Sequence, residues 1–556
     1  MLKRHIQEEK MTEQKDAMDI VNDPKNYKKM GEDEQDATTA NGCSNVSRRN
    51  FLKIGGAAAA AATLAGAGAA GFKIGRSDDA YTGYGRTYQG GDMFFNREPF
   101  RVKTAAMMEP VGKVERADRY DMIFDRLREI IGYIKSEKWN PGMGLEKLPG
   151  GVGDFYRKNP EQYKIMMDSL GKRAKSREDW NNGKHERYTL PAAYTEALAH
   201  GGMYNRFGST VPEEPDDAYK ETGKPIPPEE WDFRHVKREK PMEFKSPKDA
   251  SKLIKRMAHL FGTSIVSIGK FDPRFMFTNK MRGMPKGGAD WGDKVPEHWK
   301  SIIVFGVPMY WDQTYAAIGY CTSYDAYFRS RVTAGLLERF INELGYPARA
   351  QFPGYHYEIM MEPYMLTTGM GEYSRSGMVM VPELGCNIRP AAVITDIEFD
   401  YDQPISVKMA EFCMKCKICA ETCPSGAISS DDEPKTVVRG FKRWQVDNEK
   451  CYNQWASGQT VDALGCRVCI GVCPYSRKNT WIHTLSRELE PRDPTGLVAD
   501  GLLAMQKNFF KYPKGQDFQS DWLGGKEATY HNPPWYLRAE EVFKDIEKTW
   551  EYHGME

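Results

Sequence analysis

The fold of this chain is decided by the stretch CMKCKICAETCP, residues 413–424, in which four cysteines are spaced C-x2-C-x2-C-x3-C and are followed by proline. A second stretch, CRVCIGVCP at 466–474, repeats the C-x2-C-x3-C-P end of that pattern. Eight of the 11 cysteines lie between positions 413 and 473. Such crowding differs from the dispersed spacing of a disulfide framework and indicates metal ligation.

The spacing is typical of bacterial ferredoxins, where three thiolates of one run bind one 4Fe-4S cluster and the fourth thiolate binds the other. The second run has Ala463 where its first cysteine is expected, and Cys451 is the only nearby thiol to replace it. Zinc is the alternative, because CxxC pairs also form zinc sites, but zinc motifs seldom repeat the CxxxCP ending. We therefore predict two clusters, one held by Cys413, Cys416, Cys419 and Cys473 and the other by Cys423, Cys451, Cys466 and Cys469.

Two clusters of this kind pass electrons one at a time, so the segment is expected to feed an acceptor elsewhere in the chain. A length of 556 residues exceeds a single hydrophobic core and predicts two or more structural units. The formal net charge is +1, which gives no overall field to attract nucleic acid. We expect no nucleic-acid partner.

An export signal is indicated near the N-terminus by Ser47-Arg48-Arg49-Asn50-Phe51-Leu52-Lys53 and the uncharged Ala/Gly run at 54–70. This looks like a twin-arginine signal, and its partner would be the twin-arginine translocase, which carries folded proteins. A transmembrane helix is the alternative, but the many glycines make the run weakly hydrophobic and poorly helical. No other stretch approaches 18 apolar residues, so the mature protein is not expected to span the membrane.

The order of expected elements points to a mixed core. Apolar spacing predicts helices around 120–135, at 249–261 and at 325–344, the last ended by Gly345, and buried strands at 264–269 and 301–307. This alternation favours an α/β or α+β core. We expect a signal region at 1–75, a region without an assigned fold at 76–248, the core at 249–400, the two-cluster domain at 401–490 and an extension at 491–556.

The signal, the mixed core and the two-cluster segment together resemble the corrinoid-dependent reductive dehalogenases. Blocks similar to those of the family occur in the same order over 47–53 and about 250–485: Leu260-Phe261-Gly262, Leu344-Gly345-Tyr346, GMGEYSRSG at 369–377, and Thr395-Asp396. The resemblance implies an α+β fold, with a nitroreductase-like corrinoid-binding core beside the ferredoxin-like domain. It also implies that no side chain ligates cobalt, which agrees with the lack of an Asp-x-His-x-x-Gly motif.

The same resemblance implies two catalytic residues. The proton donor of the family corresponds to Tyr327, with Tyr324 as a nearby competitor, and its basic partner corresponds to Arg389, with Arg375 as a competitor. The residue types suit the chemistry, because a phenol with a pKa of about 10 is a poor acid unless a cation stabilises its phenolate.

The match is incomplete at one position of the substrate pocket. Some members of the family use an asparagine in the stretch that corresponds to 352–357, which has none here. His356 or Tyr357 is expected to fill its place. The substrate of any one member is therefore not carried over.

The function implied is reductive cleavage of a carbon–halogen bond in a small organohalide, by hydrogenolysis or by dihalo-elimination, as the last step of organohalide respiration. The family further implies a small integral-membrane anchor protein, an electron donor of the respiratory chain, and a peripheral location at the outer face of the cytoplasmic membrane. Two alternatives stay open at this point: an epoxyqueuosine-reductase-like enzyme, and an exported iron–sulfur electron-transfer protein without catalysis of its own.

Overall fold

The computed structural model describes residues 100–181, 241–281, 291–294, 299–309, 314, 321–352, 358–456, 466–476 and 489–509. The arginine pair of the signal, Ala463, His356 and Tyr357 lie outside these ranges. Within the described ranges, none of the helices combines the length and the apolarity needed to span a bilayer.

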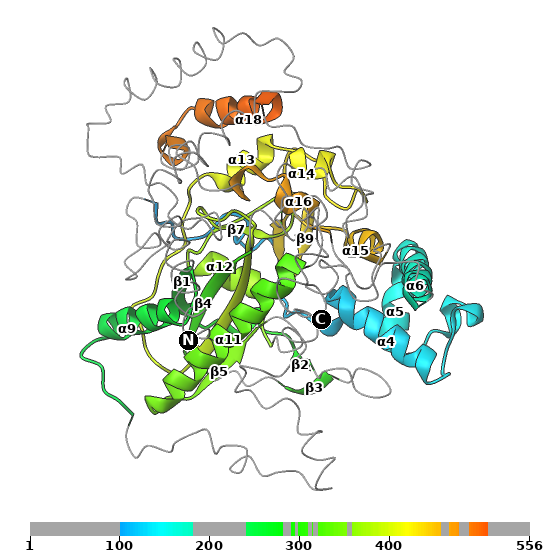
Figure 1. Ribbon diagram of the computed structural model, residues 1–556, viewed down its shortest axis with the longest axis horizontal. Coiled ribbons are helices and arrows are strands. Elements are labelled where there is room, and N and C mark those ends of the chain that lie inside the picture. Colours follow the sequence, from blue (N-terminus) through cyan, green and yellow to red (C-terminus); the bar gives the residue numbers. More distant parts are fainter. Residues whose placement is uncertain are drawn as a thin grey trace, which may run out of the picture. The chain divides into compact units, whose positions relative to one another are not determined.

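Four antiparallel strands form the central sheet, in the order β1-β4-β8-β5 (Figure 1). All eight residues of β4 are buried, and the strand is paired with β1 on one side and with β8 on the other. The predicted strands correspond to β1 and β4, and antiparallel pairing with surrounding helices makes the fold α+β, as predicted. The strands are β1 (Ile265–Lys270), β4 (Ser301–Pro308), β5 (Ala348–Gln351) and β8 (Ile388–Thr395).

Helices cover both faces of this sheet. The helices α9 (Pro247–Leu260) and α11 (Cys321–Glu343) pack on one face, and α12 (Met361–Thr367) packs on the other. Successive strand residues point to opposite faces, so Ile303 and Phe305 of β4 join the core under α9 and α11, whereas Ile302 and Val304 join the core on the α12 side.

Local signals explain the ends of the two long helices. The hydroxyl of Ser246 accepts a hydrogen bond from the Asp249 amide at 3.2 Å, and Pro247 occupies the first turn of α9. The helix α11 ends before Gly345, whose φ of +89° suits glycine and whose amide donates to the Asn342 carbonyl at 2.9 Å. Both helices agree with the sequence prediction.

The region before the core, for which no fold was predicted, is helical over part of its length. Its helices are α4 (Ile123–Lys135), α5 (Gly150–Lys158) and α6 (Pro160–Asn181), and they share a hydrophobic core with α15 (Asn448–Ala456). Figure 1 shows α15 beside α6. Since α15 carries Cys451, this region supports a predicted cluster ligand.

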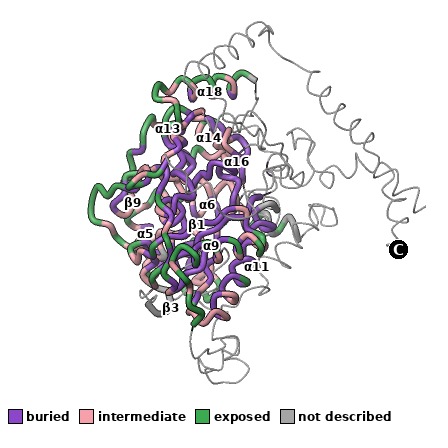
Figure 2. The backbone as a smooth tube through the Cα atoms, turned by 90° about the vertical axis from the view of Figure 1, so that its left-hand side faces the viewer, coloured by how far each residue is buried: buried purple, intermediate pink, exposed green. Residues whose placement is uncertain are grey.

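The cysteine runs form two similar turns. Each run contains a four-residue helix, α14 (Ile418–Glu421) in the first and α16 (Val468–Gly471) in the second, and these two helices contact each other. Two further helices, α13 (Met409–Lys415) and α18 (Leu497–Phe509), belong to this part. Figure 2 shows that α18 and the short strand β9 are largely exposed, whereas β1 is buried. The remaining strands are β2 (Asn279–Met281), β3 (Trp291–Lys294), β6 (Glu372–Tyr373), β7 (Val379–Met380), β9 (Thr436–Val438) and β10 (Phe441–Arg443).

Candidate active site

The two residues implied to be catalytic lie next to each other. Tyr327 is carried by α11 and Arg389 is the second residue of β8, and the guanidinium carbon lies 5.4 Å from the centroid of the phenol ring. Both side chains border one pocket. A cation over the phenol is placed where a phenolate would be stabilised, so the geometry suits the predicted pair, whose roles stay predictions.

A serine connects this pair to the second cysteine run. The hydroxyl oxygen of Ser323, one turn before Tyr327, accepts hydrogen bonds from Arg389 at 3.0 Å and from Arg467 at 2.7 Å. Arg467 is buried and also donates to the carbonyl of Cys466 at 2.8 Å. Two guanidinium groups thus meet at one neutral hydroxyl beside Tyr327.

The two competing residues occupy other places. Tyr324 is buried and is not among the described residues that line the pocket. Arg375 is 1% exposed and donates to the carbonyls of Cys413 and Cys416, each at 3.0 Å, while its guanidinium lies 4.2 Å from the Trp444 ring. Arg375 therefore holds the first cysteine loop rather than the pocket.

The pocket has a volume of about 440 Å³, within the range of small-molecule sites. Its walls come from several elements of the core and also from the region before it. Much of the lining is flexible and apolar, which suits a broad, irregular ligand. Seven methionines contribute: Met107, Met108, Met122, Met360, Met361, Met365 and Met378.

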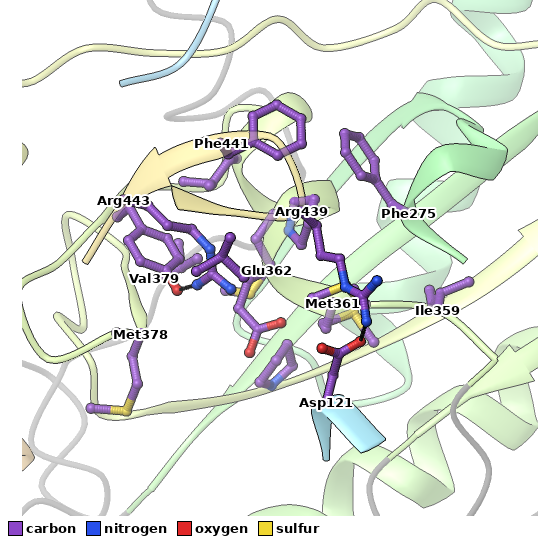
Figure 3. A pocket seen from close by; sticks show the side chains of 18 of the residues that line it. Asp121, Phe275, Ile359, Met361, Glu362, Met378, Val379, Arg439, Phe441 and Arg443 are labelled. Atoms are coloured by element: carbon purple, nitrogen blue, oxygen red, sulfur yellow. Dashed lines mark hydrogen bonds and ion pairs between the residues drawn. The ribbon is translucent and has the colours of Figure 1, made fainter. Parts of the chain in front are cut away.

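A polar rim borders the pocket at β9 and β10. Figure 3 shows Asp121 paired with Arg439 across this rim, with Oδ2 2.5 Å from Nη2. Arg443 lies 5.1 Å from the Tyr373 ring, and burial lowers the pKa of its guanidinium. Glu362 also lines this side and attracts Arg443. The rim offers both signs of charge to the polar edge of a ligand.

The eight thiols predicted as ligands influence one another mainly within the two predicted sets. Burial raises the pKa of Cys419, and the thiols of the first predicted set, together with Cys469 of the other, raise it further. Burial likewise raises the pKa of Cys469, and Cys466, Cys451 and Cys423 of the second set raise it further, while Arg467 lowers it. Cys451 follows the same pattern, because its pKa rises to about 12 through burial and through Cys466 and Cys423.

This donor set fits two iron–sulfur clusters. A buried thiol keeps its proton unless a metal displaces it, and each group offers four thiols. Among the described residues, no group of three or more His, Cys, Asp or Glu side chains is arranged to hold a metal ion. Each thiolate of a cubane cluster binds its own iron atom, so four such ligands need not converge on one point. The individual ligand assignments stay predictions.

A ninth cysteine, to which the sequence assigned no role, joins the pocket to the cysteine runs. Cys386 lines the pocket and is buried, and its amide donates to the hydroxyl of Ser476, close after the second cysteine run, at 2.9 Å. The interaction with the Cys473 thiol, together with burial, raises the pKa of Cys386, and the same interaction lowers the pKa of Cys473. No sequence signal marked Cys386, Ser323 or Arg467, because their roles depend on contacts between segments far apart in the chain.

Comparisons with known proteins agree with the sequence analysis. Residues 412–476 match the family of 4Fe-4S dicluster domains, and residues 45–65 match the twin-arginine translocation pathway signal sequence. The chain is 27% identical over 293 residues to a tetrachloroethene reductive dehalogenase of Desulfitobacterium hafniense, covering 44% of this chain and 51% of the relative. It is 31% identical over 199 residues to the tetrachloroethene reductive dehalogenase of Sulfurospirillum multivorans, covering 34% of this chain and 38% of the relative.

A solved reductive dehalogenase, described for B12-dependent dehalogenation, matches with a TM-score of 0.44 at 24% identity, over 49% of this chain and 38% of that one. An epoxyqueuosine reductase of Listeria monocytogenes shares 27% identity over 162 residues, covering 28% of this chain and 40% of that protein. The chain spans about half the length of the first curated relatives it matches. The chain is thus a relative of the reductive dehalogenases that carries a twin-arginine export signal and a 4Fe-4S dicluster domain.

Proposed function

We propose that this protein is a corrinoid-dependent reductive dehalogenase that cleaves a carbon–halogen bond of a small organohalide. The observation that carries the proposal is the contact of Tyr327 with Arg389 in a pocket whose lining residue Cys386 is hydrogen-bonded to Ser476, at the end of the second cysteine run. An acid, a cation and an electron supply are the three groups that replacement of a halogen by hydrogen requires.

We assign the corrinoid to the methionine-lined pocket, and the clusters to the two sets of four cysteines predicted from the sequence. The pocket supports this assignment through its apolar walls and its polar rim, which match a broad ring with polar side arms. When bound, the corrinoid supplies the reduced cobalt centre that accepts or attacks the halogen.

The chain itself contributes the proton and the charge. In hydrogenolysis the substrate takes up two electrons and one proton and releases halide, and Tyr327 donates that proton from its hydroxyl. Arg389 stabilises the resulting phenolate and, with Arg467 nearby at Ser323, attracts the departing halide. The methionines exclude water from the reacting carbon. In dihalo-elimination both halogens leave and no proton is needed.

The cellular setting follows from the signal and the resemblance. Export by the twin-arginine translocase would place the protein at the outer face of the cytoplasmic membrane, held there by a small integral-membrane anchor protein. Electrons would come from a donor of the respiratory chain and pass through both clusters. In this assignment the corrinoid-binding core spans 249–400 and the cluster domain spans 401–490.

The test is metal content followed by activity. Purified, reconstituted protein should contain eight iron atoms and one cobalt atom per chain, and with reduced viologen it should release halide from members of a panel of chlorinated and brominated alkanes, alkenes and aromatics. Iron without cobalt favours the electron-transfer protein. Cobalt without halide release favours an enzyme of the epoxyqueuosine-reductase kind, to be checked with epoxyqueuosine-modified tRNA.

The role of Tyr327 is tested by comparing two reactions in one variant. Tyr327→Phe should slow hydrogenolysis about 10²–10⁴-fold, the usual contribution of a general acid, and should leave elimination from a vicinal dihalide almost unchanged. The matched control is Tyr324→Phe, which removes the neighbouring hydroxyl outside the pocket and should retain hydrogenolysis. Equal slowing of both reactions by Tyr327→Phe would show that the hydroxyl is structural.

A further inference from the structure

One buried serine of α11 stands close to the pocket without lining it. Ser323 is fully buried and lies four residues before Tyr327, so the two side chains leave the same side of the helix one turn apart. Tyr327 borders the pocket, whereas Ser323 is not among the described residues that line it. Any effect of Ser323 on a ligand in the pocket is therefore exerted through its neighbours.

The hydroxyl of Ser323 is used in every direction that a hydroxyl offers. Such a group has one proton to donate and two lone pairs that accept. The oxygen accepts hydrogen bonds from Arg389 at 3.0 Å and from Arg467 at 2.7 Å, and the proton is directed to the sulfur of Met309, 3.5 Å away. Because a guanidinium can only donate, an alanine at position 323 would remove this acceptor from both arginines at once.

Arg389 is held through two nitrogens of its guanidinium group. Nη2 donates to Ser323, and Nη1 donates to the carbonyl of Ile388 at 2.9 Å. In this orientation the guanidinium carbon lies 5.4 Å from the centroid of the Tyr327 ring. The bond to Ile388 stays within strand β8, whereas the bond to Ser323 ties the cation to the helix that carries the tyrosine. A long side chain with many rotamers depends on such an anchor for its orientation.

Arg467 connects the serine to the second cysteine run. Its side chain donates from Nη1 to the carbonyl of Cys466 at 2.8 Å, and its guanidinium carbon lies 5.2 Å from the centroid of the Trp455 ring. Its Nε donates to Ser323. The helix of the pocket tyrosine is thus linked to a defined point of the cysteine run.

The chemical nature of the acceptor is as important as its place. A carboxylate at position 323 would form ion pairs with the two guanidinium groups, whereas a hydroxyl orients them without adding an opposite charge. Arg389 is required as a cation, because a positive charge stabilises a phenolate that forms on Tyr327. A serine therefore suits this position better than an acidic residue.

We propose that Ser323 is a positioning residue, which holds the guanidinium of Arg389 against Tyr327 and ties this pair to the second cysteine run through Arg467. The proposal rests on the proposed function for the reaction in which the pair takes part, but the position of Arg389 can be measured without it. Loss of the Ser323 hydroxyl should let the guanidinium turn away from the phenol, while the lining of the pocket stays the same.

The first experiment measures two reactions of the reconstituted holoprotein in the Ser323→Ala variant. Hydrogenolysis should slow about 10–10²-fold, the usual contribution of one hydrogen bond to a charged group. Elimination from a vicinal dihalide should slow less, because it needs Arg389 for the departing halide but needs no proton donor. The loss should appear in kcat and leave KM almost unchanged, since Ser323 is not part of the described lining.

Further variants show whether Arg389 is the residue through which Ser323 acts. In an Arg389→Met background, Ser323→Ala should cause no further loss, because the anchored group is absent. Ser323→Thr keeps the hydroxyl and should restore most of the rate. The matched control is Ser330→Ala, which removes an equally buried hydroxyl of α11, bonded to the Tyr327 carbonyl at 3.0 Å, and should keep the ratio of the two reactions.

A crystal structure of Ser323→Ala gives a readout that does not depend on the reaction. It should show the Arg389 guanidinium displaced from the Tyr327 ring, and an unmoved guanidinium overturns the proposal while dehalogenation stands. Equal slowing of hydrogenolysis and elimination, or additive losses in the Arg389→Met background, overturns it as well. Absence of halide release from the wild-type protein overturns the proposed function instead, and the structure of the variant then still decides how Arg389 is held.

Discussion

Removal of Arg126 should loosen the helix that carries Cys451. Arg126 of α4 forms an ion pair with Glu449 of α15, and the two side chains are only 3% and 5% exposed. Arg126→Met would leave the Glu449 carboxylate buried without its cation, while the Tyr156 hydroxyl donates a hydrogen bond to it at 3.4 Å. Breaking a buried pair in this way costs about 3–5 kcal/mol.

The measurement is local, because a protein with several cofactors does not unfold in two states. Hydrogen exchange followed by mass spectrometry reports the opening of residues 448–456. A loss of 3–5 kcal/mol corresponds to exchange about 10²–10⁴-fold faster in that segment. Faster loss of iron from one cluster to a chelator should accompany it, since Cys451 lies within the segment.

A double-mutant cycle with Glu449→Met decides whether the pair is the cause. The combined Arg126→Met and Glu449→Met variant should open much less readily than the sum of the single effects, because no charge is left buried. The control is Arg128→Met, which removes an ion pair to Asp125 within α4 and should leave α15 unaffected. Strict additivity of the two single variants would refute the reasoning.

Three further predictions concern the first cysteine loop and the segment from Gly385 to Arg389, which borders the pocket. Burial raises the pKa of Glu372 to about 8. Between about pH 4.5 and pH 8 the native state therefore binds one proton more than the unfolded state, and the stability of the protein should fall as pH rises through this range. Glu372→Gln should flatten the dependence of Tm on pH. Gly385→Ala should lower Tm far more than Gly426→Ala, because both have positive φ but only the first Cβ meets backbone. Arg375→Met should lose iron from one cluster, because the hydrogen bonds to the carbonyls of Cys413 and Cys416 are removed. Arg375→Lys should retain more iron than Arg375→Met, because lysine keeps the positive charge although it lacks the five donors of the guanidinium.

Each of these three has a contradicting result. A Tm that falls equally steeply with pH in Glu372→Gln would assign the dependence to other groups. An equal decrease of Tm in Gly385→Ala and Gly426→Ala would mean that the chain at Gly385 can move away from the second cysteine run. Full iron content in Arg375→Met would show that the loop holds its shape without the guanidinium.

The sequence predicted the elements with strong periodicity and missed one central strand. The helices at 249–261 and 325–344 and two strands were found because their apolar residues repeat regularly. The strand β8 escaped, since it contains Pro390 and two alanines, which are unusual in a central strand. The structure explains this exception, because β5 pairs only with 392–395 and Pro390 therefore faces a partner on one side alone.

The candidate site was predictable only through the resemblance to a family. Tyr327 and Arg389 are 62 positions apart, and no local pattern indicates that they meet. The choice between Arg389 and Arg375 likewise required the structure, which places the first at the pocket and the second at the cysteine loop. The contribution of residues before position 123 to the pocket was not predicted, because that region lies outside the resemblance.

The segment from Gly385 to Arg389 restricts how this protein can be altered, because it borders the pocket and also packs against the end of the second cysteine run. A substitution there that widens the pocket would also disturb Tyr475 and Ser476, so a change of ligand fit would carry over to the cysteine run. The methionines on and next to α12 accept exchange for other apolar residues at small cost. Libraries aimed at altered ligand fit should therefore vary Met360, Met361 and Met365 and keep Gly385 to Arg389 intact.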